Sequence, residues 1–101
     1  MRKLFLRVLI KELMEFIFNG SLKNIAKMDR VSISIDRPVP LKDLLGQLEK
    51  HLGSLVPYGA ETTDAQLLAN LSFFKGNQML RIIDEIEPAD QIMVLLPATG
   101  G

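Results

Sequence analysis

The sequence predicts an α+β fold in which a mixed sheet of four or five strands packs against one main helix. Two patterns predict this arrangement: apolar and serine side chains alternate strictly in residues 31–35, and leucines recur at helical spacing in residues 41–52. A third observation is the length of 101 residues, which suffices for one hydrophobic core and not for two. All elements are therefore expected to share a single domain.

The N-terminal third contains two candidate segments for the opening of the sheet. We expect the opening strand in residues 4–10, because apolar side chains recur there at every second position. Residues 12–18 (ELMEFIF) are ambiguous, since three of their apolar side chains also fit one face of a helix. Residues 19–21 signal a turn and residues 22–27 an elaborated connection to a half-exposed second strand at 31–35.

The most regular segment is the helix expected over residues 41–52. Pro38 and Pro40 end the preceding strand, and Pro40 suits the first turn of a helix. Gly53 follows the last apolar position and predicts the end of the helix. The apolar face of this helix comprises Leu41, Leu44, Leu45, Leu48 and Leu52.

The C-terminal half is expected to complete the sheet. Residues 53–63 are typical of a loop, and Thr63 to Gln66 fit a capping box that starts a short helical turn. The segments expected after it are a strand at 71–74, a turn at 75–77, a short strand at 79–83, a turn at 88–90 and a last strand at 91–96.

The order of these elements predicts a β-grasp fold. In a small domain, one helix laid across a four- or five-stranded mixed sheet is the compact way to bury both apolar surfaces. We assign residues 1–97 to this β-grasp domain and residues 98–101 to a flexible tail. Residues 1–36 carry seven basic and four acidic side chains, whereas residues 76–101 carry one and four. If the two ends form adjacent strands, we expect a surface on which these charges compensate one another.

Composition argues against several classes of function. Twelve basic residues balance twelve acidic ones, so no net field attracts a nucleic-acid backbone. Cysteine is absent and His51 is the single histidine, which argues against a metal centre and against an independent hydrolytic enzyme. Arg7 and Lys11 interrupt the apolar N-terminus, and no uncharged run is long enough for a membrane span. A cytoplasmic protein that binds neither nucleic acid nor membrane is expected.

The C-terminal end of the chain carries the candidate functional residues. The expected last strand is followed by Pro97-Ala98-Thr99-Gly100-Gly101. Because Gly100 and Gly101 have no side chains, the tail can thread a narrow cleft and present its α-carboxylate to a partner. The terminal carboxylate is therefore the candidate reactive group.

Exposed apolar residues beside this terminus would form a docking patch. Met93 and Leu95 share one face of the last strand, and they stay exposed if Ile92, Val94 and Leu96 face the helix. The alternative is that the elaborated region over residues 12–30 covers them. Phe74 is a further candidate for the same patch.

The whole chain resembles the ubiquitin-like sulfur carriers, a group that includes ubiquitin-related modifier, the small subunit of molybdopterin synthase and the archaeal small modifier proteins. The ending from Leu95 to Gly101 looks like that of the synthase subunit, and residues 88–92 stand at the place of its acidic turn into the last strand. Residues 15–20, the leucine-rich helix and the long loop after it are more similar to ubiquitin-related modifier. Either subfamily fits.

The resemblance implies a protein co-substrate that is not itself an enzyme. A separate activating enzyme of the ubiquitin-activating type would use ATP to adenylate the Gly101 carboxylate, and the chain would bind no cofactor of its own. The activated end would become a thiocarboxylate or be joined to lysines of other proteins. Partners would be a molybdopterin synthase large subunit, a tRNA-thiolation enzyme or conjugated targets, met through Met93, Leu95, Phe74, Pro97 and Thr99. The alternative is a β-grasp interaction module that never reacts.

Overall fold

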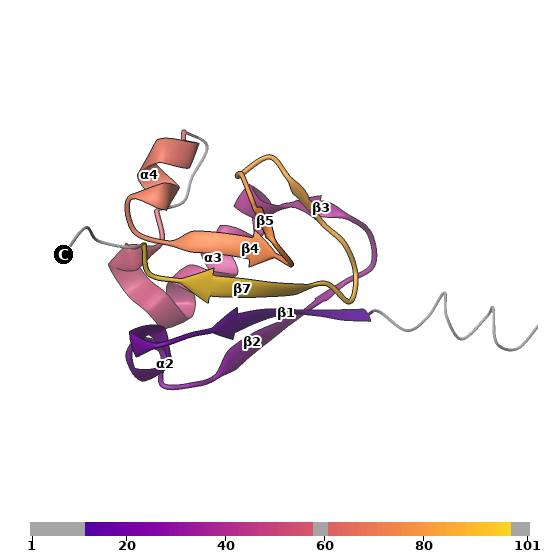
Figure 1. The fold of residues 1–101 in the computed structure, drawn as a ribbon. Helices are drawn as coiled ribbons and strands as arrows, with labels where there is room; N and C mark the ends of the chain where they lie inside the picture. Colours follow the sequence, from indigo (N-terminus) through magenta and orange to yellow (C-terminus); the bar gives the residue numbers. More distant parts are fainter. Residues whose placement is uncertain (1–11, 58–60, 98–101) are drawn as a thin grey trace, which may run out of the picture.

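The computed structural model describes residues 12–57 and 61–97, which form the expected α+β, β-grasp architecture (Figure 1). The main sheet is mixed and has five strands in the order β2-β1-β7-β4-β5. The pair β1 and β7 is parallel, and the other neighbours are antiparallel. Its strands are β1 (Glu12–Phe18), β2 (Arg30–Ile35), β4 (Ser72–Lys75), β5 (Gln78–Met79) and β7 (Gln91–Leu95).

One helix of twelve residues, α3 (Leu41–Leu52), covers a face of this sheet as predicted. All five leucines of its apolar face are buried. Pro40 precedes the helix as its N-cap residue, and Gly53 caps its end with a φ of 60°, a left-handed value that favours glycine. The shorter helices are α2 (Ser21–Ala26), η1 (Gly53–Leu55) and α4 (Asp64–Leu68). At the start of α4, Thr63 and Gln66 form the predicted capping box.

The hydrophobic core lies between the sheet and α3. Phe16 of β1 and Phe73 of β4 are fully buried, and their rings meet edge to face with centroids 5.9 Å apart. Ile92 and Val94 of β7, the strand between β1 and β4, are also fully buried. The inward side chains of the three central strands therefore pack as one layer beneath the helix.

Several local predictions need correction. The ambiguous segment 12–18 is strand β1, and the strand expected at 4–10 lies outside the described residues. The strand expected at 79–83 is reduced to β5, which ends at Met79, because Leu80 and Ile82 turn into the core instead. A second sheet of two short strands, β3 (Val39–Pro40) and β6 (Glu85–Ile86), was not predicted.

The small second sheet positions the start of α3. The first backbone amides of the helix, those of Leu41 and Lys42, donate to the carbonyl oxygens of Asp84 and Ile82 at 2.9 and 3.0 Å. These amides have no partner within the helix itself, so the segment before β6 satisfies them. This contact fixes the loop that leads into β7 against the helix.

Candidate functional site

Strand β7 is the element from which the chain runs to its Gly-Gly end. It lies in the middle of the sheet, with β1 on one side and β4 on the other, so both of its edges are hydrogen-bonded. The Asn19 amide donates to the Val94 carbonyl oxygen at 3.2 Å and ties the end of β1 to the end of β7. The last described residue is Pro97, and Thr99, Gly100 and Gly101 lie outside the described residues. The candidate site thus begins at the central strand β7, which is hydrogen-bonded on both sides (Figure 1).

The face of the sheet turned away from α3, called the open face below, carries a row of apolar side chains. In register across four strands, Met79 lies opposite Phe74, Phe74 opposite Met93 and Met93 opposite Ile17. We call these four residues the apolar row. Met79 and Met93 remain 46% and 41% exposed, and Phe74 and Ile17 are half-buried. The structure therefore places the candidates Met93 and Phe74 side by side.

Residues 12–30 do not cover Met93, contrary to the alternative drawn from the sequence. This region forms β1, inside the sheet, and α2, which contacts α3. Leu95 lies on the same face as Met93, opposite Ser72, and is half-buried. The expectation for Leu96 is wrong: this side chain was placed against the helix, but it is 40% exposed because β7 ends one residue earlier.

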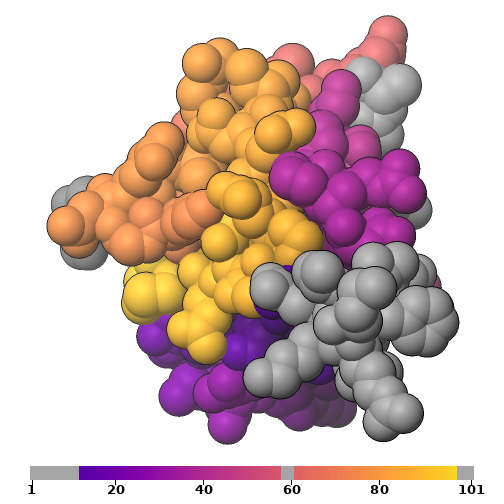
Figure 2. All heavy atoms as spheres, turned by 90° about the vertical axis from the view of Figure 1, so that its right-hand side faces the viewer, coloured from indigo at the N-terminus to yellow at the C-terminus, as the bar shows by residue number. Residues whose placement is uncertain are grey.

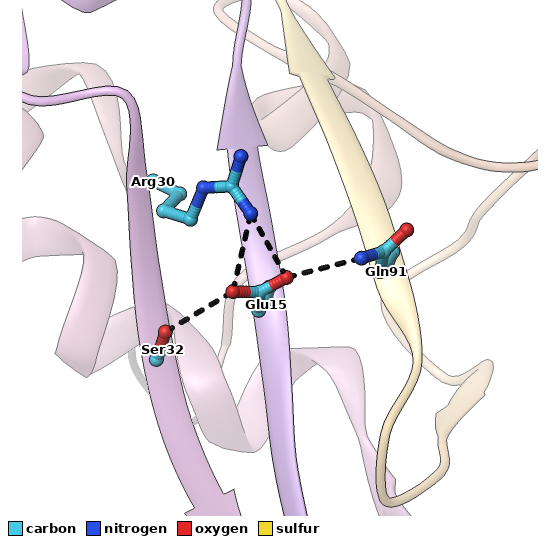
Figure 3. Close-up of polar contacts among 4 residues, drawn as sticks. All are labelled: Glu15, Arg30, Ser32 and Gln91. Atoms are coloured by element: carbon cyan, nitrogen blue, oxygen red, sulfur yellow. Dashed lines mark hydrogen bonds and ion pairs between the residues drawn. The ribbon is translucent and has the colours of Figure 1, made fainter.

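A polar cluster on the open face adjoins the apolar row, and the sequence analysis did not identify it (Figure 3). The Glu15 carboxylate accepts hydrogen bonds from Arg30 Nη1 at 3.3 Å, from Ser32 Oγ at 3.4 Å and from Gln91 Nε2 at 3.1 Å. These residues come from β1, β2 and β7, so one carboxylate links three strands. Glu15 and Ser32 are opposite each other in the register, but Gln91 is too distant in sequence for a local pattern to reveal the contact.

The turn before β7 is built by carboxylates that act as local hydrogen-bond acceptors. Asp84 accepts from the Arg81 amide and Asp90 from the Glu87 amide, each at 2.8 Å. Lys75 Nζ lies 2.9 Å from Asp90, and this hydrogen bond raises the pKa of Lys75 above its ordinary 10.5. Asp84 and Asp90 therefore shape the turns on either side of β6 that lead into β7.

Neither a cluster of metal-ligating side chains nor a membrane-spanning helix is present in the described part of the chain. Residues 12–57 and 61–97 contain no group of three or more histidine, cysteine or acidic side chains that could hold a metal ion. Among the helices of these same residues, none has the length and apolar character needed to cross a bilayer.

The described residues form a β-grasp domain whose central strand, β7, is followed in the sequence by Gly100 and Gly101. Searches by sequence find no matching family model and no matching curated protein. The structure does match solved structures. Small archaeal modifier protein 1 of Haloferax volcanii aligns over 86% of this chain and 99% of its own, with 13% identity and a TM-score of 0.60.

Two other solved structures are similar to the same extent. A putative molybdopterin converting factor subunit 1 from Pyrococcus furiosus aligns over 86% of this chain and 99% of its own, with 17% identity and a TM-score of 0.61. The Haloferax volcanii protein HVO 2177 aligns over 90% and 88%, with 17% identity and a TM-score of 0.62. At these identities the likeness confirms the predicted β-grasp fold, and the names of the first two neighbours are those of a small archaeal modifier protein and a putative molybdopterin converting factor subunit.

Proposed function

We propose that this chain is a ubiquitin-like sulfur carrier and protein modifier whose reactive group is the Gly101 carboxylate. The observation that carries the proposal is the position of the Gly-Gly end. It follows the central strand of a β-grasp fold, and the neighbours in that fold are a small modifier protein and a subunit of a molybdopterin converting factor. The chain would act as a protein co-substrate in the cytoplasm, and the catalytic groups would belong to its partners.

The proposed chemistry has two steps. A carboxylate oxygen of Gly101 attacks the α-phosphorus of ATP on a separate activating enzyme, pyrophosphate leaves, and an acyl adenylate forms. A sulfide donor then attacks the acyl carbon and AMP leaves, which yields the thiocarboxylate. Alternatively a lysine amine attacks the same acyl carbon, AMP leaves, and an isopeptide bond forms. ATP is held by the activating enzyme, so this chain needs no cofactor of its own.

The open face supplies the proposed docking surface for these partners. Met93 is 41% exposed and lies directly opposite half-buried Phe74, so a partner can bury both without disturbing the core. Leu95 and Pro97, both half-buried, continue from this pair toward the terminus. Thr99 belongs to the tail that enters the partner's cleft. An activating enzyme, a molybdopterin synthase large subunit or a tRNA-thiolation enzyme would each bind here.

Intact-mass spectrometry tests the proposal directly. The purified chain is incubated with ATP, a sulfide donor and candidate activating enzymes of the ubiquitin-activating type. We expect an AMP adduct without the donor, and with it a mass gain equal to replacement of one oxygen by sulfur. Deletion of Gly101 moves the carboxylate back by about 3.5 Å of extended chain and should abolish both products.

Two controls separate activation from folding. The deletion of Gly101 should leave the unfolding transition unchanged, because this residue lies beyond the last strand. Gly100→Val keeps the carboxylate at its position but adds bulk to the tail, so it should slow activation without abolishing it. If the deletion variant is modified as fast as the full chain, the carboxylate is not the reactive group. An unchanged mass with every enzyme supports a non-reactive interaction module instead.

A further inference from the structure

The proposed function uses the open face as a docking surface and assigns no role to residues 1–11. The sequence before β1 contains seven apolar and four cationic residues, and no acidic one. The cationic residues are Arg2, Lys3, Arg7 and Lys11. Among the described residues, β1 is the first strand of the sheet, and the residues 4–10 expected to form the opening strand lie outside them.

Residue 11 precedes β1, and the first residues of β1 include one that is exposed on the open face. Leu13, near the start of β1, shares the open face with Glu15 and Ile17 because strand side chains alternate, and it is 57% exposed. Glu15 of β1 and Gln91 of β7 lie between Leu13 and the apolar row, so a segment that starts at this end of the sheet would cross the polar cluster before it reaches the row. It would do so without passing around an edge of the sheet.

Charge at this end of the sheet is complementary to that segment. Figure 2 shows the side of the molecule where the 80–90 segment lies beside the start of β1, and the Glu15 amide donates to the Asp90 carbonyl oxygen at 2.8 Å. Glu87 and Asp90 place two carboxylates there. Lys75 contacts Asp90 at 2.9 Å and Glu87 at 3.8 Å. One lysine between two carboxylates leaves one negative charge, which a cation from residues 1–11 would neutralise.

The length of the segment fits the distance to be covered. Eleven residues span at most about 36 to 40 Å when extended. The apolar row reaches from β1 to β5 across three strand spacings, about 14 Å. Covalent attachment also gives the segment an effective concentration in the millimolar range at its own sheet, which favours binding within one chain over binding to a second chain.

We propose that residues 1–11 bind the open face of the same molecule, with their apolar side chains on Leu13 and the apolar row and their cationic side chains toward the acidic turn before β7. This inference goes beyond the proposed function and does not depend on it. If the proposed docking also holds, the segment competes with the activating enzyme for Met93 and Phe74, and removing it speeds activation.

Paramagnetic NMR tests the proposal on the full chain. Because the sequence has no cysteine, Arg2→Cys creates a single site for a nitroxide label. We expect loss of amide signal intensity at Ile17, Phe74 and Met93. Signals of Lys42 and Lys50, on the polar side of α3, should keep their intensity. Adding Leu6→Asp and Val8→Asp to the labelled chain removes apolar contacts within the segment and should restore the open-face signals.

A mixed sample distinguishes contact within one chain from contact between two chains. It combines chain that carries the nitroxide but no NMR isotope with chain that carries the isotope but no nitroxide. The proposal requires that open-face signals keep their intensity in this mixture. Loss of intensity there assigns the segment to a second copy and overturns the proposal. Equal loss on the open face and on α3, or no loss on either, means that residues 1–11 do not bind the open face and overturns it as well. Neither result touches the chemistry of Gly101.

Discussion

Met93 of β7 stands directly opposite Phe74 of β4 on the face of the sheet turned away from α3. Their neighbours along each strand point the other way: Ile92, Val94 and Phe73 are fully buried. Adjacent positions in β7 therefore have opposite roles, one set holding the fold and the other set available to a partner. This alternation makes the two roles separable by mutation.

Met93→Asp should weaken docking and leave the fold intact. The side chain is 41% exposed, so wherever residues 1–11 are not bound over it the charge stays in water and costs at most about 1 kcal/mol of strand preference. In a complex the same charge would be desolvated, and we expect at least about tenfold weaker binding to an activating enzyme. Titration calorimetry and urea unfolding measure the two effects.

Two other aspartate substitutions in β7 serve as comparisons for Met93→Asp. Ile92→Asp places the charge in the core and should unfold the domain, since an unpaired buried carboxylate costs several kcal/mol. Leu95→Asp, at a half-buried position, should weaken docking with an intermediate loss of stability. If Met93→Asp also unfolds the protein, the assignment of the two strand faces is wrong.

Glu15→Gln should lower the free energy of unfolding by less than the three hydrogen-bond partners of Glu15 suggest. The variant loses the ion pair with Arg30, whose side chain is 52% exposed, so solvent screens most of that interaction. We expect about 0.2 to 1 kcal/mol of coupling between Glu15 and Arg30 in a double-mutant cycle with Arg30→Gln. A coupling of several kcal/mol would show that the cluster is a main determinant of stability rather than a surface link between strands.

Asp64→Ala should destabilise the protein because it removes the hydrogen-bond acceptor of a backbone amide that is distant in sequence. Asp64 Oδ1 accepts a hydrogen bond of 2.8 Å from the backbone N–H of Ile82, in a partly buried position. Its removal leaves that N–H without a partner, which costs about 1 to 3 kcal/mol. Asp64→Asn retains an acceptor oxygen at the same place and should recover most of the loss in chemical denaturation. Equal losses in both variants would assign the effect to the charge instead.

The Lys75–Asp90 contact predicts a small loss of stability at high pH. The hydrogen bond to Asp90 raises the pKa of Lys75 in the folded state, so its stabilising contribution is complete below the unfolded-state pKa of about 10.4. The contribution is lost as pH rises through the raised folded-state pKa. Because the lysine side chain is 39% exposed, the effect should not exceed about 1 kcal/mol.

The matched variant for this prediction is Lys75→Met. Other groups also titrate above pH 10, so the informative quantity is the difference in unfolding free energy between the two proteins. That difference should be constant below about pH 10 and should shrink in the range above it, as pH rises through the raised folded-state pKa of Lys75. A difference that stays constant over this range would mean that Lys75 acts through its aliphatic chain and not through its charge.

Elements defined by neighbouring residues could be predicted from the sequence. The helix α3 follows from five leucines spaced on one face with Pro40 before and Gly53 after, and β2 follows from strict alternation. The capping box of Thr63 and Gln66 is likewise a contact over three residues. In each case the residues whose spacing forms the element lie close together in the sequence, so the local pattern is enough to predict the element.

The tertiary structure alone decided the features that depend on distant partners. Residues 4–10 and 12–18 both allow a strand, and β1 is the segment whose Phe16 meets Phe73 in the core. Strands β3 and β6 have two residues each, too few for any periodicity, and exist because they pair with each other. Glu15 and Gln91 are joined only by the parallel register of β1 and β7. Local spacing records which side chains share a face, whereas strand pairing depends on the free energy of burying faces that the chain brings together only when it folds.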